Sequence, residues 1–182
     1  RGQGEADKPE GASSLAEQAE DAGAVLDALD VPSAAVVGSS SGGYVAQQLA
    51  IAHPRKVAAL VLVGAPLSLH GRAAFADEVD RLTDPVDEAW VRDSLAWFPP
   101  LHEVPQWFLE DRVRDGLRMP AHVWQGILNG LCSAPPPTET GTIQTPTRSP
   151  WRPGDRVRPR ATPATPAARH PGPLPAPPAR GA

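Results

Sequence analysis

The chain has 182 residues, 21 of them acidic and 17 basic, and its net charge of −4 argues against a nucleic-acid-binding protein, which usually carries a basic face. A single cysteine excludes a disulfide scaffold, and no apolar run reaches the roughly 18 residues that a membrane-spanning helix needs. The length fits one domain. We therefore expect a cytoplasmic protein with neither a nucleic-acid nor a membrane partner.

The composition changes at about residue 132. Residues 132–182 hold 14 of the 23 prolines and seven arginines, but only two acidic residues. Few large apolar side chains are present to offset the entropy of ordering, so we expect a disordered tail with local polyproline II structure. Residues 1–67 and 68–131 have periodic apolar residues instead, and each is expected to form a folded unit.

Residues 13–29 are predicted to form the first helix. Ser13 or Ser14 can cap it, and Glu17 stands at capping-box spacing from Ser14. Helical spacing gives this segment one apolar face, which consists of Leu15, Ala19, Ala22, Leu26 and Leu29.

Two short apolar runs follow, residues 34–37 and 57–63, and both are predicted to be strands. Neither alternates with polar residues, which indicates strands buried on both faces. Residues 44–53 between them have helical spacing and end at His53-Pro54. Two buried strands joined through a helix form a parallel βαβ unit, so the fold class is expected to be α/β.

Residues 68–131 contain no strand pattern and are predicted to form several short helices separated by prolines. Four of the five tryptophans of the chain lie in this segment. Large aromatic side chains rarely remain exposed as a group, so we expect them to form an apolar side that lines a substrate cavity next to Ser40. These residues are Trp90, Trp97, Trp107 and Trp124.

The stretch between the first predicted strand and its helix has the pattern Gly-x-Ser-x-Gly, with Ser40 in the middle. Strand, tight turn and helix are the context that this motif requires, and the turn lifts the serine hydroxyl above the carboxyl edge of the sheet. We expect Gly38 and Gly42 to leave room for the tight backbone. Ser40 is the predicted nucleophile, and the Ser41 N–H at the helix start is a predicted oxyanion donor.

The alternative interpretation of this turn is a phosphate-binding loop. A Walker loop needs a lysine that is missing here, and the glycine spacing of a dinucleotide-binding loop is missing as well. The five histidines and the single cysteine show no metal-ligand spacing, so we expect neither a metal nor another cofactor.

The order of these motifs over residues 1–131 resembles the α/β-hydrolase family. Residues 1–9 look like the loop after the family's fourth strand, and residues 68–131 lie where the family has its cap or lid. Their tryptophan-rich helices resemble the cap of small-substrate bacterial esterases and lactonases. The resemblance implies a partial α/β-hydrolase sheet in residues 1–67, a helical cap in residues 68–131, and a chain that is incomplete at both ends.

The resemblance also implies an acid and a histidine after the nucleophile. Asp155 stands at the acid position of the family pattern, in Trp151-Arg152-Pro153-Gly154-Asp155. The strand that should precede it, residues 145–150, contains two prolines and an arginine and is not expected to form. His170 is the only later histidine and is expected to be an exposed tail residue. His70, after the second strand, is a candidate for lining the site.

Two functions are compatible with this sequence. The first is a serine hydrolase that cleaves an ester, lactone or related acyl bond of a small hydrophobic molecule through Ser40. The second is a catalytically inactive, truncated or frameshifted remnant of such an enzyme, acting at most as a binding module for a small molecule or a protein. The intact serine motif favours the first, and the missing histidine favours the second.

Overall fold

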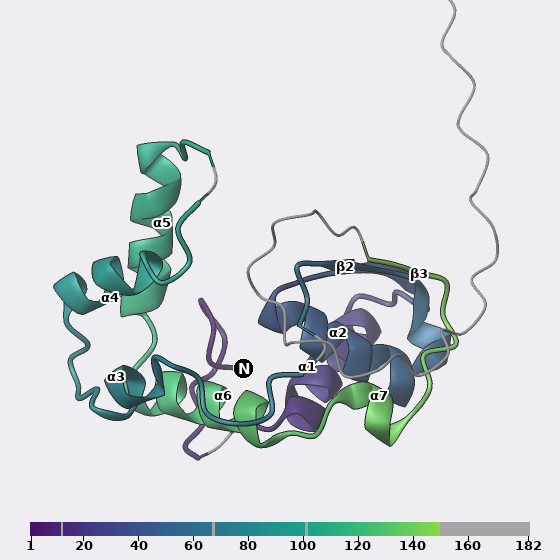
Figure 1. Ribbon diagram of the computed structural model, residues 1–182. Coiled ribbons are helices and arrows are strands. Elements are labelled where there is room, and N and C mark those ends of the chain that lie inside the picture. The colour runs from purple at the N-terminus through teal and green to yellow at the C-terminus, as the bar shows by residue number, and fades with distance from the viewer. Residues whose placement is uncertain (12, 67, 101, 150–182) are drawn as a thin grey trace, which may run out of the picture.

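The computed structural model describes residues 1–11, 13–66, 68–100 and 102–149 of the chain. Within them, three strands form one sheet in the order β1-β2-β3, and the helices lie around and beside it (Figure 1). The elements, in chain order, are α1 Leu15–Ala28, β1 Ala34–Ser39, α2 Ser41–Ala52, a 3₁₀ turn Pro54–Lys56, β2 Val57–Val63, α3 Ala76–Asp80, α4 Glu88–Leu95, α5 Gln106–Leu117, α6 Ala121–Ser133, α7 Pro137–Thr140 and β3 Thr147–Arg148.

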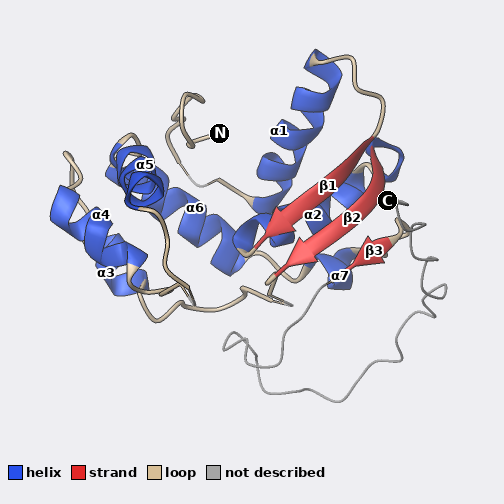
Figure 2. Cartoon of the chain, turned by 90° about the horizontal axis from the view of Figure 1, so that it is seen from above, coloured by secondary structure: helices blue, strands red, loops and turns tan. Residues whose placement is uncertain are grey.

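The strands β1 and β2 are paired in parallel, and α2 connects them in the chain. This arrangement confirms the predicted α/β class. Helices α1 and α2 both lie on one face of the sheet (Figures 1 and 2). The core between this face and the two helices is built from small and branched apolar side chains, namely Ala19, Ala46, Leu49, Ala50, Val57, Leu60 and Leu62.

The other face of the sheet differs from the sequence-based expectation. Val37 is 68% exposed and Val63 is 43% exposed, so the prediction that both strands are buried on both faces is wrong for the described residues. Successive side chains of a strand point to opposite faces, and α1 and α2 cover only the one that carries Leu60 and Leu62. The sequence did not reveal this difference because alanine and valine occupy both faces.

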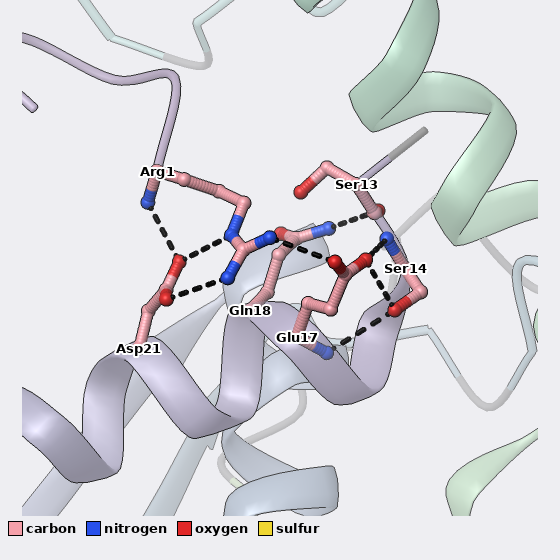
Figure 3. A network of polar contacts seen from close by, with 6 residues as sticks. All are labelled: Arg1, Ser13, Ser14, Glu17, Gln18 and Asp21. Carbon is pink, nitrogen blue, oxygen red and sulfur yellow. Dashed lines mark hydrogen bonds and ion pairs between the residues drawn. The ribbon is translucent and has the colours of Figure 1, made fainter. Parts of the chain in front are cut away.

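Helix α1 begins as predicted, at a capping box. The Ser14 hydroxyl accepts the Glu17 N–H at 3.2 Å, and the Glu17 carboxylate accepts the Ser14 N–H at 2.9 Å. The Arg1 guanidinium lies over the first two turns and donates to Glu17 at 2.8 Å and to Asp21 at 2.7 Å (Figure 3). The hydrogen bond from Arg1 holds the pKa of Asp21 well below its usual value, although partial desolvation opposes the shift.

The expected helices of residues 68–131 are present as α3 to α6. Asp87 caps α4 by accepting the Trp90 N–H at 3.0 Å, and Pro105 and Pro120 stand directly before α5 and α6. Proline has no N–H to lose at a helix start, so these residues separate the helices without weakening them. The four helices lie on the side toward which the arrowheads of β1 and β2 point (Figure 2). We call these four helices, with the loops that join them, the cap.

The segment after residue 132 is ordered further than predicted. Residues 132–149 contain the end of α6, α7 and the edge strand β3, so the expected disorder is wrong for this part of the predicted tail. The Leu60 N–H donates to the Pro146 carbonyl at 2.9 Å, and the Thr145 hydroxyl donates to the Val57 carbonyl at 3.2 Å. Proline is tolerated here because an edge strand needs hydrogen bonds on one side only.

Residues 150–182, with the candidate acid Asp155 and the late histidine His170, lie outside the described residues. In the described part of the chain, no helix has the length and apolar character needed to cross a membrane.

Candidate active site

Ser40 occupies the tight turn between β1 and α2, at φ 50° and ψ −125°. Among the described residues, only Asp30 shares a positive φ without being glycine. An L-residue in such a region is strained by about 1–3 kcal/mol and persists only where its surroundings hold it. Here the Ser40 N–H donates to the Val63 carbonyl at 3.0 Å, and the Gly43 N–H donates to the Ser40 carbonyl at 2.9 Å.

Two glycines let the backbone close around this turn, and one of them differs from the prediction. A Cβ on Gly38 would lie 2.6 Å from the Cα of Gly43, and a Cβ on Gly43 would lie 2.3 Å from the Cβ of Ala65. A Cβ on Gly42 would meet nothing within 4 Å. The close approach therefore requires Gly38 and Gly43, whereas the motif had pointed to Gly38 and Gly42.

Ser40 is exposed, as are its neighbours Ser39 and Ser41. Ser41 is the first residue of α2, where N–H groups have no acceptor within the helix, and the described hydrogen bonds give its N–H no other acceptor. The positive end of the helix dipole lies at the same place. A hydroxyl in front of free N–H donors is the arrangement that an acyl-transfer site uses to attack a carbonyl and hold the resulting oxyanion.

We call the turn formed by residues 38–43 the elbow, or nucleophile elbow. Tyr44, in the first turn of α2, connects the elbow to the end of the cap. The side chain is fully buried, its hydroxyl donates to the Ala134 carbonyl at 3.4 Å, and its ring packs with Leu131 at the end of α6. Leu69, from the loop after β2, packs against the same group. Burial raises the pKa of the Tyr44 hydroxyl, so this phenol stays protonated and serves as a structural donor.

No histidine among the described residues is hydrogen-bonded to Ser40. His53 closes the other end of α2, about 18 Å away along a 12-residue helix, and its Nε2 lies 2.9 Å from Glu20. In the cap, the Nε2 of His122 lies 3.3 Å from the carbonyl oxygen of Lys8, which belongs to the loop before α1. Exposed His70 follows β2 in the chain, and its backbone N–H donates to the Ser68 hydroxyl at 3.0 Å.

Three of the four cap tryptophans come together. Trp90 makes edge-to-face contacts with Trp97, at 5.5 Å between ring centroids, and with Trp124, at 5.2 Å. Trp107 does not belong to this cluster, because it is 66% exposed and contacts Phe108 instead. The expected common apolar side is thus formed by three rings, and the first turn of α5 turns the fourth toward solvent.

Two of the cavities formed by the described residues bear on the site. The smaller, about 40 Å³, lies between Arg1, Ser13 and α6, and the buried Ser13 hydroxyl has no partner among the described residues. The larger, about 140 Å³, lies inside the cap and is lined in part by Trp124. Neither cavity is lined by Ser40, so the expected cavity between Ser40 and the cap is not one of them.

Side chains that bind metals do not gather at the elbow. Within residues 1–149, leaving aside the three undescribed positions, no group of three or more His, Cys, Asp or Glu residues has the arrangement to hold a metal ion. The chemistry of this site, as described, rests on serine hydroxyls and backbone N–H groups.

Comparison with known proteins agrees with this geometry. The family model for the alpha/beta hydrolase fold matches residues 1–110, which is more than half of the chain. The chain therefore belongs to the alpha/beta hydrolase fold family.

Solved structures of other proteins share this fold. A hydrolase from Pseudomonas aeruginosa PA01 is 29% identical, with a TM-score of 0.67 over 82% of this chain and 57% of that one. Est816, an N-acyl homoserine lactone degrading enzyme, is 28% identical, with a TM-score of 0.65 over 82% of this chain and 60% of that one. An esterase from Exiguobacterium antarcticum, at 22% identity and a TM-score of 0.66 over 82% of this chain and 59% of that one, shows the shared fold. The chain thus spans less than two thirds of their lengths.

Proposed function

We propose that this chain provides the nucleophile and cap of a serine hydrolase that cleaves an ester, lactone or related acyl bond of a small hydrophobic molecule. The observation that carries the proposal is Ser40, exposed at φ 50° between a strand and a helix and held there by the close approach of Gly38 and Gly43. Membership of the alpha/beta hydrolase fold family supports it. So does the likeness to a hydrolase and to a lactone-degrading enzyme at 29% and 28% identity.

In the proposed reaction, the Ser40 oxygen attacks the carbonyl carbon of the substrate and gives up its proton to a general base. The carbonyl electron pair moves onto oxygen, and the Ser41 N–H donates a hydrogen bond to that oxyanion. Collapse of this intermediate breaks the acyl–oxygen bond, and the leaving oxygen takes the proton from the base. Water then repeats the attack on the acyl-enzyme and releases the acid.

The proposal also assigns the other residues of the active site. Asp155 follows β3 by seven residues, and β3 runs parallel to β2, so the chain leaves it in the direction of the edge that carries Ser40. We propose Asp155 as the triad acid on this ground. His70 follows the carboxyl end of β2, at the same edge, and is proposed to line the site. Of the aromatic residues, Trp90, Trp97 and Trp124 are proposed to support the substrate side of the cap.

One observation favours a second candidate function, that of an inactive binding module. Among the described residues, no histidine is hydrogen-bonded to Ser40. Loss of triad function typically lowers turnover by about a million-fold, so a chain without a base would retain the shape of the site and almost no activity.

Labelling with a fluorophosphonate probe distinguishes the two functions. An activated serine reacts with the probe, so the full chain should be labelled and the Ser40→Ala variant should not. Ser39→Ala and Ser41→Ala are matched controls, because both remove an exposed hydroxyl from the same turn and leave Ser40 in place. Hydrolysis of a short-chain p-nitrophenyl ester should follow the same pattern.

Each result decides between the alternatives. No labelling of the full chain would reject the hydrolase and leave the binding module. Equal labelling of the full chain and of Ser40→Ala would show that another residue reacts, which contradicts the role of Ser40. A loss confined to Ser40→Ala supports the proposal.

A further inference from the structure

The larger of the two cavities lies in the cap, apart from the elbow, and its walls are partly apolar and partly polar. Its volume is about 140 Å³, and it is formed by α4, α5, α6 and the loop before α1. A buried cavity of about 150 Å³ accommodates a benzene molecule, so there is room for a short aliphatic group. Because Ser40 does not line it, a ligand here would not be the acyl group under attack.

One wall of this cavity carries a positive and a negative charge. Arg112 and Asp115 both line it, and their spacing of three places them on the same face of α5. Among the described residues neither forms an ion pair, whereas Arg114 and Asp111 on the same helix pair at 2.8 Å. The described residues therefore leave both charges facing the cavity available to a ligand.

The inner wall adds a buried hydroxyl. Ser94 lines the cavity and is only 8% exposed, and its hydroxyl donates to the Val91 carbonyl at 2.7 Å. Because its proton is used in this bond, the oxygen is left with lone pairs that can accept a hydrogen bond from a ligand.

The apolar part of the cavity is fixed in place before any ligand binds. The Trp124 ring is held by its Nε1–H, which donates to the Gly116 carbonyl at 3.3 Å, and Val91 is 1% exposed. A Cβ on Gly116 would lie 2.6 Å from the Cγ1 of Val91, so α4 and α5 touch where they form the cavity. A preformed apolar pocket with a few convergent polar groups is typical of small-molecule sites.

We propose that this cavity is a binding site for a small aliphatic amino acid of the size of valine or leucine. Its carboxylate would pair with Arg112, its ammonium group with Asp115 and the Ser94 oxygen, and its side chain would lie against Trp124. A purely anionic ligand would face Asp115, and a purely cationic one would face Arg112, so a zwitterion is the ligand class whose charges match the wall.

Three probes that share a branched aliphatic chain test the charge requirement on the full chain. L-leucine carries both charges, isovalerate keeps the carboxylate, and isoamylamine keeps the ammonium group. In ligand-observed NMR titrations at pH 7, leucine should bind at least about tenfold more tightly than either single-charge probe, since one charge-assisted hydrogen bond corresponds to roughly this factor.

Exposed-residue variants then assign each charge. Arg112→Gln should weaken leucine about tenfold without weakening isoamylamine, and Asp115→Asn should weaken leucine without weakening isovalerate. Arg114→Gln and Asp111→Asn are matched controls, because these two residues form an ion pair and do not line the cavity. Circular dichroism checks that each variant is folded.

Three outcomes would overturn the proposal. The first is no saturable binding of leucine to the full chain. The second is isovalerate binding as tightly as leucine, with Asp115→Asn without effect, which would indicate an anion site. The third is equal weakening by Arg112→Gln and Arg114→Gln, which would indicate only the general charge of α5.

Discussion

The elbow and the cap keep their shapes by different means. At the elbow, backbone meets backbone: Gly38 and Gly43 approach each other, and Ser40 is held at a positive φ by hydrogen bonds of its own main chain. In the cap, side chains determine the arrangement, with Trp90 between two other indole rings. The contacts of Gly38 and Gly43 leave no room for an added atom, whereas the tryptophan cluster depends on atoms that are already there. Substitutions at Gly38, Trp90 and Ser40 test this difference, in order of expected effect, and a fourth at Asp21 tests helix α1.

The largest effect is expected from Gly38→Ala. The new Cβ would meet the Gly43 Cα at 2.6 Å and the Gly42 carbonyl oxygen at 2.8 Å, both of them backbone atoms that cannot move aside alone. We expect the free energy of unfolding to fall by about 4 kcal/mol, measured by urea denaturation.

Gly42→Ala is the matched control for that variant. It changes the other glycine of the motif, where a Cβ would meet nothing within 4 Å and where the backbone is helical. Alanine in a helix is more stable than glycine by about 0.5–1 kcal/mol, so this variant should be as stable as the parent chain or slightly more stable. If Gly42→Ala were as damaging as Gly38→Ala, the steric account of the elbow would be wrong.

The elbow could be predicted from the sequence because its signal is local. A glycine and serine turn directly after an apolar run and before a helical one predicts strand, turn and helix, and Ser14 with Glu17 predicts the capped start of α1. The motif cannot show which glycine makes the close contact, because the partner of Gly43 is Ala65, from the loop after β2. Contacts between distant segments are absent from a local pattern.

In the cap, Trp90→Ala should cause the second largest effect. It removes the ring that contacts both Trp97 and Trp124, and truncation of a packed tryptophan lowers the free energy of unfolding by about 3 kcal/mol. Trp107→Ala is the comparison on the same cap, and it should change stability by less than about 0.5 kcal/mol because Trp107 is 66% exposed. Similar losses from both would contradict the three-ring cluster.

Sequence reasoning placed Trp107 with the other rings because composition gives the number of aromatic residues and not the side of a helix they occupy. A similar limit explains why β3 was not predicted. Its two residues, Thr147 and Arg148, carry no apolar pattern, and only their pairing with Leu60 and Val61 makes them a strand. The exposed face of the sheet was missed because valine and alanine occupy it as well as the covered face.

Ser40→Gly and Ser40→Ala together measure the strain at the elbow. Both remove the hydroxyl, so both should abolish probe labelling, but only glycine adopts φ 50° without strain. We expect the glycine variant to unfold at higher urea concentration, with a free energy of unfolding about 1 kcal/mol above that of the alanine variant. Equal stabilities would indicate that the turn stores no strain.

The smallest effect is expected from the ion pair over α1, which belongs to neither the elbow nor the cap (Figure 3). Asp21→Asn removes one of the two carboxylate partners of Arg1. Because the Asp21 side chain is 34% exposed, solvent screening limits the loss at pH 7 to about 0.5 kcal/mol. Asp7→Asn is the comparison, because Asp7 is an exposed carboxylate in the loop that carries Arg1. It should change the free energy of unfolding by less.

The stabilisation by the Asp21 carboxylate depends on pH. Because Arg1 holds the pKa of Asp21 below that of the unfolded chain, the folded state is stabilised when the carboxylate is ionised in both states, above about pH 4. That contribution is lost as the pH falls toward the depressed pKa of the folded state. The difference in free energy of unfolding between the parent chain and Asp21→Asn should therefore shrink between pH 5 and pH 2, approximate limits set by the ordinary pKa of aspartate and the downward shift. A difference that stayed constant over this range in urea titrations would mean that Asp21 stabilises α1 by something other than its charge.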